Sequence, residues 1–209
     1  YSEIMVPANA PDWASNRTLL WNNVEKSEKR VDARLFREVE VALPHELTDE
    51  QNQELLREYS RIFTKDGMIV DLSIHGLNHN PHCHMMLTLR DIVNGEFGKK
   101  NREWNDSAKV ELWRKAWATL VNKHLAKAGF NITVDHRSYE KQGLDVIPTV
   151  HEGREGIGGH NKEKVTARRQ RNRTVREHNK NRSELKSFQK QAEQIQEDIE
   201  IVDEELAEL

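Results

Sequence analysis

The chain has 209 residues, of which 36% are hydrophobic and 32% charged, with a formal net charge of −3. This length fits one medium-sized domain with an appendage. A mean hydropathy of −0.86 excludes an apolar run long enough to cross a membrane, and no apolar signal segment opens the chain. We therefore expect a soluble, cytoplasmic protein. Because the net charge is near zero, a nucleic-acid partner has to be argued from the distribution of charge.

The first third of the chain carries two helical patterns around one strand pattern. Residues 12–30 place apolar groups on one helical stripe, which predicts a helix. Residues 34–43 alternate at period two and end at a proline, as a strand does. Thr48 and Gln51 then form a capping box ahead of a helical stripe that stops near Gly67.

The middle of the chain predicts a strand pair and a further helix. Residues 68–75 and 82–90 are short apolar-rich runs joined by a Gly/Asn/Pro loop, which favours an antiparallel pair. Residues 107–128 keep one apolar stripe behind a cap at Ser107, so they predict a long helix. A short strand is expected at 132–134. We interpret residues 1–151 as one domain.

The composition changes beyond that domain. Residues 152–161 are glycine-rich and predict a linker. Residues 162–182 hold nine Lys or Arg against two Glu, which suits either a DNA contact or a solvated helix. Apolar residues then recur at spacings of three and four: Leu185, Phe188, Ala192, Ile195, Ile199, Val202, Leu206 and Leu209. This pattern predicts one long C-terminal helix over 162–209 that either packs back on the domain or self-associates through residues 185–209.

Strand parity divides the expected sheet into two faces, because side chains alternate along a strand. One parity carries Val39, Val41 and Leu43 in the first strand, and it is apolar throughout the other two strands. The other parity is polar and carries these side chains: Glu38, Glu40, Asp71, Ser73, His75, His82, His84, Met86, Thr88 and Arg90. This split predicts an α+β fold, with a central antiparallel β-sheet whose helices pack on one face.

Three histidines meet on the polar face. His82 and His84 lie at the start of one strand, and His75 ends the strand before it, so a tight hairpin brings the imidazoles together. Three neutral imidazoles leave positions open on a divalent metal, as a Lewis-acid site requires. Cys83 has the opposite parity and is expected in the core; as the only cysteine, it also excludes an internal disulfide. His79 is the alternative fourth ligand, which would close a structural zinc site.

The stretch IHGLNHNPHCHMMLTLR, residues 74–90, resembles the three-histidine motif of the MobA/MobL relaxases in the HUH endonuclease superfamily. The resemblance extends over about residues 1–151. Further blocks follow in the family's order at residues 2–13, 28–47, 97–106 and 135–143. An ordered set of blocks is more specific than one motif.

The resemblance implies a relaxase for plasmid mobilisation, which nicks single-stranded DNA at a transfer origin and acts with accessory mobilisation proteins and secretion coupling machinery. A tyrosine attacks the scissile phosphate and keeps a 5′-phosphotyrosyl bond. The implied metal ligands are His75, His82 and His84, beside an acidic pair that matches Glu38 and Glu40. The family implies Mg²⁺ or Mn²⁺, whereas three histidines suit Zn²⁺, Mn²⁺ or Co²⁺ better, so Mn²⁺ ranks first.

Two features depart from the family's pattern. None of Tyr1, Tyr59 and Tyr139 matches the position of the nucleophilic tyrosine, so we expect a chain that lacks the nucleophile segment, binds metal and forms no covalent intermediate by itself. Gly76 stands where many relatives carry an acidic residue, which predicts different support for the histidines.

Basic residues follow the histidine strand. Arg90, Lys99, Lys100 and Arg102 surround a glycine-bearing loop and are the expected DNA contacts, with a solvated surface as the alternative reading. The competing function is a catalytically inert module that binds DNA or assembles partners around a structural metal site.

Overall fold

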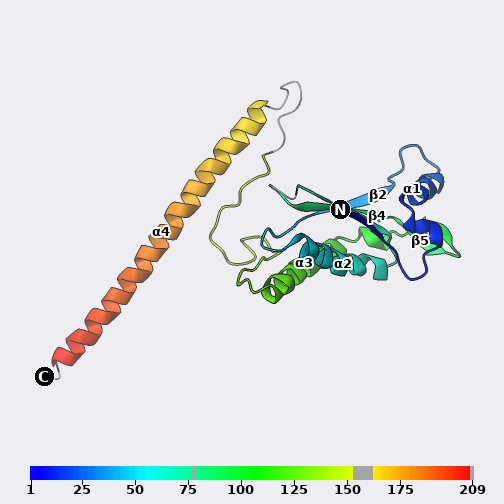
Figure 1. Cartoon of the computed structure of the whole chain (residues 1–209). Helices are drawn as coiled ribbons and strands as arrows, with labels where there is room; N and C mark the ends of the chain where they lie inside the picture. The colour runs from blue at the N-terminus through cyan, green and yellow to red at the C-terminus, as the bar shows by residue number, and fades with distance from the viewer. Residues whose placement is uncertain (77–78, 153–161, 208–209) are drawn as a thin grey trace. The chain divides into compact units, whose positions relative to one another are not determined.

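A computed structural model describes residues 1–76, 79–152 and 162–207 of the chain, without the side chains of 162–165 and 202–207. It divides into two compact units, residues 1–136 and 137–209. The first unit holds the sheet, and the second holds a long helix (Figure 1). Most of the expected linker at 152–161 lies outside the described residues, so the expected domain boundary stays a prediction.

The sheet of the first unit has four strands: β1 (Ser2–Met5), β2 (Phe36–Ala42), β3 (Val70–His75) and β4 (His82–Thr88). Their order is β1-β3-β4-β2, and every neighbouring pair is antiparallel. The expected strand and strand pair are confirmed. β1 was not expected, because four residues are too few for an alternating pattern to stand out.

Helices α2 (Asp49–Lys65) and α3 (Ser107–Lys127) pack on the apolar face of this sheet (Figure 1). Val39 and Leu89 of the predicted apolar parity are only partly buried. The others are buried in one core: Val41, Leu43, Met68, Val70, Leu72, Ile74, Cys83, Met85 and Leu87. The predicted α+β class with its antiparallel sheet, helices and long C-terminal helix is therefore confirmed.

The starts of these two helices differ in how well the sequence predicted them. The capping box of Thr48 and Gln51 forms at the start of α2. The cap of α3 is Asp106 rather than Ser107, because the Asp106 carboxylate accepts the Ala108 N–H at 2.9 Å. An aspartate and a serine are both good caps, so the sequence alone did not separate them.

The expected single helix over 12–30 is wrong. A 3₁₀ turn, η1 (Asp12–Ser15), precedes the shorter helix α1 (Arg17–Lys26). The break falls at Asn16, whose side chain accepts the Leu19 N–H at 3.1 Å and caps α1. Asparagine competes with helical hydrogen bonds in this way, so it starts a new helix here.

Helix α1 also contacts the polar parity of the sheet, through Asp71. The Asp71 side chain is 1% exposed, and it accepts a bidentate pair of hydrogen bonds from Arg17 at 2.8 and 3.0 Å. Trp21 Nε1 donates to the same carboxylate at 2.8 Å. These hydrogen bonds raise the pKa of Arg17. Asp71 therefore joins α1 to the sheet and is structural.

The glycine-bearing loop after β4 is a β-hairpin, formed by β5 (Arg90–Val93) and β6 (Glu96–Lys100). Its turn is Asn94-Gly95, with φ of 52° and 80°. An Asn-Gly pair between two runs is a strong hairpin signal, because both turn residues take positive φ. The expectation of a simple loop missed that signal. A 3₁₀ turn, η2 (Glu103–Asn105), follows.

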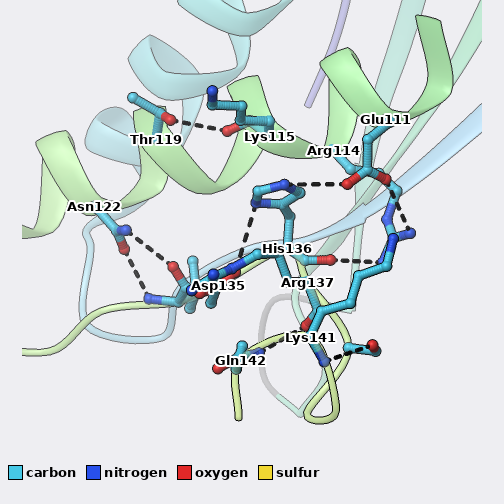
Figure 2. A network of polar contacts seen from close by, with 12 residues as sticks. Glu111, Arg114, Lys115, Thr119, Asn122, Asp135, His136, Arg137, Lys141 and Gln142 are labelled. Carbon is cyan, nitrogen blue, oxygen red and sulfur yellow. Dashed lines mark hydrogen bonds and ion pairs between the residues drawn. The ribbon is translucent and has the colours of Figure 1, made fainter. Parts of the chain in front are cut away.

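Residues 132–134 do not form the expected strand. Figure 2 shows the reason: the Asn122 side chain of α3 binds the backbone of Val134 in both directions, accepting its N–H at 2.8 Å and donating to its C=O at 3.0 Å. His136 adds an ion-pair contact to Glu111 of the same helix at 3.2 Å. The segment is thus held by helix side chains, which take the place of a strand partner.

The second unit contains α4 (Lys162–Ala207), which confirms the long C-terminal helix. Its apolar residues Leu185, Phe188, Ile195 and Ile199 are all at least 48% exposed. Self-association and packing back on the domain both stay predictions. Among the described residues, no helix combines the length and apolarity that spanning a membrane needs.

Candidate metal centre

The three histidine rings lie together at one end of the sheet. His75 ends β3 and pairs in register with His82, which begins β4, while His84 lies opposite Glu40 of β2. The ring centroids are 5.9 Å apart for His75 and His82, 5.3 Å for His75 and His84, and 5.1 Å for His82 and His84. Strand register and parity therefore gather the imidazoles on one face.

Two of the rings are oriented by hydrogen bonds at Nδ1. His84 Nδ1 lies 2.6 Å from Glu38 Oε1, and His82 Nδ1 lies 2.6 Å from the Asn80 carbonyl oxygen. Because a carboxylate and a carbonyl only accept, each Nδ1 carries the proton of the neutral ring. The Nε2 atom of each ring then carries no proton, so its lone pair can bind a metal. Such outer contacts commonly hold metal-binding histidines.

Glu40 lies close to the His82 and His84 rings. One ligand atom each from Glu40, His82 and His84 lie within 4.8 Å of one another. Two imidazole nitrogens and a carboxylate oxygen suit Mn²⁺ or Zn²⁺ in kind, so the residues fit a divalent cation. His75 lies beside this set but outside it. Its side chain is exposed, so its ring is free to reorient toward a bound ion.

The two residues that could close the site lie apart from that set. Cys83 is buried on the opposite face, and burial raises the pKa of its thiol to about 12. A thiol that keeps its proton is a poor ligand. His79 is exposed and is absent from the set within 4.8 Å. The grouped residues therefore leave coordination positions open.

Gly76 shapes the turn that orients His82. Its φ is +67°, and a Cβ at this position would lie 2.4 Å from the Asn80 carbonyl oxygen. That oxygen is the one that holds His82 Nδ1. Any side chain at residue 76 therefore displaces the acceptor, which is a physical reason for glycine here.

We expect Gly76→Ala to weaken Mn²⁺ binding by about 10- to 100-fold, the usual effect of losing an outer contact of a ligand histidine. Isothermal titration with Mn²⁺ measures it. Gly129→Ala is the matched control, because Gly129 has φ of +87° and no atom within 4 Å of its Cβ position. Equal affinity of the two variants would refute this role of Gly76.

The family model for MobA/MobL matches residues 1–164 of the chain. The chain belongs to the MobA/MobL family. A probable conjugal transfer protein TraA of Sinorhizobium fredii is 40% identical over 73% of this chain and 17% of its own length. Mobilization protein A of Escherichia coli is 32% identical over 68% of this chain and 23% of its own length. The chain thus spans less than a fifth of the TraA relative.

A solved structure from a study of the molecular basis of vancomycin resistance transfer in Staphylococcus aureus is also similar. It has 41% sequence identity and a TM-score of 0.64, over 66% of this chain and 76% of its own. The MobA/MobL membership predicted from the ordered blocks is therefore confirmed by sequence and by fold.

The basic residues of this MobA/MobL chain lie at the far end of β4 from the histidines. From His84 to Thr88, where β4 ends, the four-residue rise of an extended strand is about 13 Å, and Arg90 begins β5 after a bend at residue 89. Arg90 donates to Glu28 at 3.0 Å, and Lys100 lies 3.1 Å from the same carboxylate. Lys99 and Arg102 are exposed. Of the four expected DNA contacts, Arg90 and Lys100 are therefore paired with Glu28, whereas Lys99 and Arg102 are exposed to solvent.

Glu28 is the anchor of this basic region, with a side chain that is 9% exposed. Burial raises the pKa of Glu28, but the hydrogen bonds from Arg90 and Lys100 lower it by more than burial raises it, so the net shift is downward. A carboxylate with a lowered folded-state pKa stabilises the fold above its unfolded pKa, and loses that effect as the pH falls through the folded value.

We expect Glu28→Gln to reduce the free energy of unfolding at pH 7 by about 1–3 kcal/mol. Below the unfolded glutamate pKa of about 4.3 the gap to wild type narrows, because Glu28 itself becomes protonated. Urea denaturation at pH 7 and pH 3 measures both values. Glu96→Gln, at an exposed site in β6, is the control and should have little effect at either pH. If the difference in free energy of unfolding between wild type and Glu28→Gln is equal at both pH values, the negative charge of Glu28 does not stabilise the fold.

Proposed function

We propose that this chain forms the metal-binding core of a relaxase, which nicks one strand of DNA at a plasmid transfer origin. The proposal rests on two observations: the Nδ1 atoms of His82 and His84 are both engaged, which leaves both Nε2 atoms able to bind a metal, and a carboxylate oxygen of Glu40 lies near both rings. Membership in a family of relaxases, which are DNA nickases, supports the substrate and the reaction.

The ligands we propose are His75, His82 and His84, with Mn²⁺ ranked before Mg²⁺ and Zn²⁺. A bound cation there supplies Lewis-acid stabilisation of charge on the scissile phosphate. Glu38 keeps the His84 ring in the tautomer that presents Nε2. Glu40 takes one of two roles, either a further ligand or the acceptor of the proton that the attacking hydroxyl loses.

The nucleophile is proposed to be a tyrosine other than the three in this chain. Tyr59 is buried, its hydroxyl donates to the Trp113 carbonyl, and burial raises its pKa. The Tyr1 hydroxyl lies between Glu3 and Arg57 of α2, and α2 packs on the sheet face opposite the histidines. Tyr139 belongs to the second unit.

The proposal is tested with the chain extended by a tyrosine-bearing segment from the TraA relative. With Mn²⁺ and a labelled single-stranded origin oligonucleotide, we expect a covalent protein–DNA adduct that survives denaturation. The extended chain carrying His82→Ala and His84→Ala should give none. DNA binding without an adduct supports the inert DNA-binding or assembly module, and a bound zinc with four protein ligands including His79 supports a structural site.

Glu38→Ala is expected to weaken Mn²⁺ binding by about 10- to 100-fold, because His84 loses the acceptor that fixes its ring. Glu38→Gln should lose less, since its amide oxygen still accepts from Nδ1. Titration calorimetry compares both with Glu46→Ala, an exposed acid beyond β2. If the Glu46 and Glu38 variants bind alike, Glu38 has no positioning role.

Accessory mobilisation proteins and secretion coupling machinery are proposed as partners on the basis of the family alone. Self-association through residues 185–209 is proposed from the exposed apolar stripe of α4.

A further inference from the structure

The first half of α4 holds an extended stretch of the second unit, residues 144–152. Asn179 Oδ1 accepts the Ile147 N–H at 3.0 Å, and its Nδ2 donates to the Ile147 C=O at 2.8 Å. Asn172 binds the backbone of Val150 in the same two ways, at 2.9 and 2.7 Å. Each asparagine therefore satisfies both backbone polar groups of one residue. We call these two asparagines the clamp.

The spacing of the clamp matches the repeat of an extended peptide. Asn172 and Asn179 are seven helical residues apart, a rise of about 10.5 Å at about 1.5 Å per residue. Ile147 and Val150 are three extended residues apart, a rise of about 10 Å at about 3.3 Å per residue. Seven residues are close to two helical turns, so both amides lie on one side of α4. The clamp therefore fits extended backbone.

Opposite charges hold the two ends of the same stretch. Asp145 and Glu152 lie one at each end, seven residues apart in the sequence. Glu152 Oε1 also accepts a hydrogen bond from Asn172 Nδ2 at 3.1 Å. Both carboxylates form ion pairs with cations of α4, namely Arg182 and Lys186 for Asp145, and Arg169 and Arg176 for Glu152. The face of α4 thus binds a peptide with an acid at each end.

The middle of the stretch is bound mainly through its backbone. Val146, Ile147 and Val150 are each at least 38% exposed, whereas Asn172 of the clamp is 1% exposed. The stretch therefore buries little apolar surface, and exposed ion pairs contribute little in water. Another extended peptide with the same two charges can make the same contacts.

We propose that this face of α4 is a binding site for an extended acidic segment of a protein partner, with two carboxylates seven residues apart. Residues 144–152 are its occupant within the chain, and a partner segment competes with them for the clamp. An occupant in the same chain has an effective concentration of up to about the millimolar range, so it suppresses binding of the partner until it is released. The inference goes beyond the proposed function and uses no residue of the metal centre.

The test titrates the full chain with a fluorescein-labelled, end-capped peptide of residues 144–152 and follows its anisotropy. In Asp145→Lys/Glu152→Lys, the vacated variant, the chain's own stretch carries charges that repel the cations of α4. We expect this variant to bind the peptide at least about tenfold more tightly than wild type, because the competitor in the chain is lost. Adding Asn172→Ala/Asn179→Ala should weaken that binding at least about tenfold. No binding by the vacated variant, or equal binding without the clamp, would overturn the proposal.

Asn181→Ala in the vacated variant is the matched control, because Asn181 is an exposed asparagine of α4 two residues from the clamp and on another side of the helix. It should leave the affinity for the peptide unchanged. Circular dichroism establishes that α4 is helical in every variant. A loss as large as that from the clamp substitutions would show that the clamp is not the binding site.

A second peptide separates backbone recognition from charge. The Ile147→Pro/Val150→Pro peptide keeps both carboxylates but lacks the two N–H groups that the clamp accepts. It should bind the vacated variant at least about tenfold more weakly. Equal binding of the two peptides would mean that charge alone is recognised and would overturn the proposal. Displacement of the labelled peptide by a single-stranded oligonucleotide as effectively as by unlabelled peptide would assign this face to nucleic acid instead.

Amide hydrogen exchange in the unlabelled full chain gives a further readout. The Ile147 and Val150 N–H groups should exchange at least about tenfold more slowly in wild type than in Asn172→Ala/Asn179→Ala, and excess peptide should speed their exchange in wild type. Equal rates in the two proteins would show that the clamp is not closed in solution and would overturn the inference, while leaving the proposed metal centre untouched.

Discussion

His84→Ala is expected to abolish measurable Mn²⁺ binding, with a loss of more than about 100-fold in affinity. The loss should exceed that for an outer residue, which is 10- to 100-fold, because His84 supplies a donor atom directly. Its Nε2 is the free nitrogen of a ring whose Nδ1 is held by Glu38. Isothermal titration of the purified chain with Mn²⁺ measures the change.

His45→Ala is the control for that experiment, because His45 is exposed and lies outside the grouped ligands. It should bind Mn²⁺ as the wild type does. If His84→Ala retains wild-type affinity, the imidazole cluster is not the binding site and the proposed nickase loses its metal.

Asp71→Ala should give the largest loss of stability, about 2–4 kcal/mol in the free energy of unfolding. The substitution leaves Arg17 and the Trp21 indole N–H without their common acceptor beneath α1. Because Arg17 is 47% exposed, water satisfies part of its need, which keeps the cost below that of a fully buried ion pair. Chemical denaturation monitored by fluorescence measures it.

Asp12→Ala is the matched control for Asp71, since Asp12 is a surface acid in η1 and should cost less than about 0.5 kcal/mol. Metal affinity at 25 °C should be retained in Asp71→Ala, because Asp71 contacts α1 rather than the histidines. A loss below 1 kcal/mol would contradict the structural role of Asp71.

Strand parity was the most informative feature of the sequence. It placed Cys83 in the core and the three histidines on the other face, and both follow from period two alone. However, the parity of residues within a strand does not determine how that strand aligns with its neighbour. The contact between Glu38 and His84 depends on how β2 aligns with β4, so the sequence indicated an acid near the site without showing which histidine it orients.

Other elements could not be predicted from the sequence because the hydrogen bonds of a single side chain determine their secondary structure. Asn16 divides the expected first helix, and Asn122 holds Val134 where a strand was expected. Each is one asparagine whose choice of partner depends on tertiary structure. The basic residues follow the histidine strand in sequence. In the structure they lie at the end of β4 opposite the histidines. Nearness in sequence was a poor guide to nearness in space there.

In the proposed site, His82 and His84 present their Nε2 atoms to one divalent cation. Anomalous X-ray diffraction at the manganese edge, on crystals saturated with Mn²⁺, tests it most directly. We predict one strong peak within coordination distance of both Nε2 atoms, with Glu40 or a reoriented His75 completing the contacts. No peak between these two rings, or a cation bound only elsewhere, would contradict the claim.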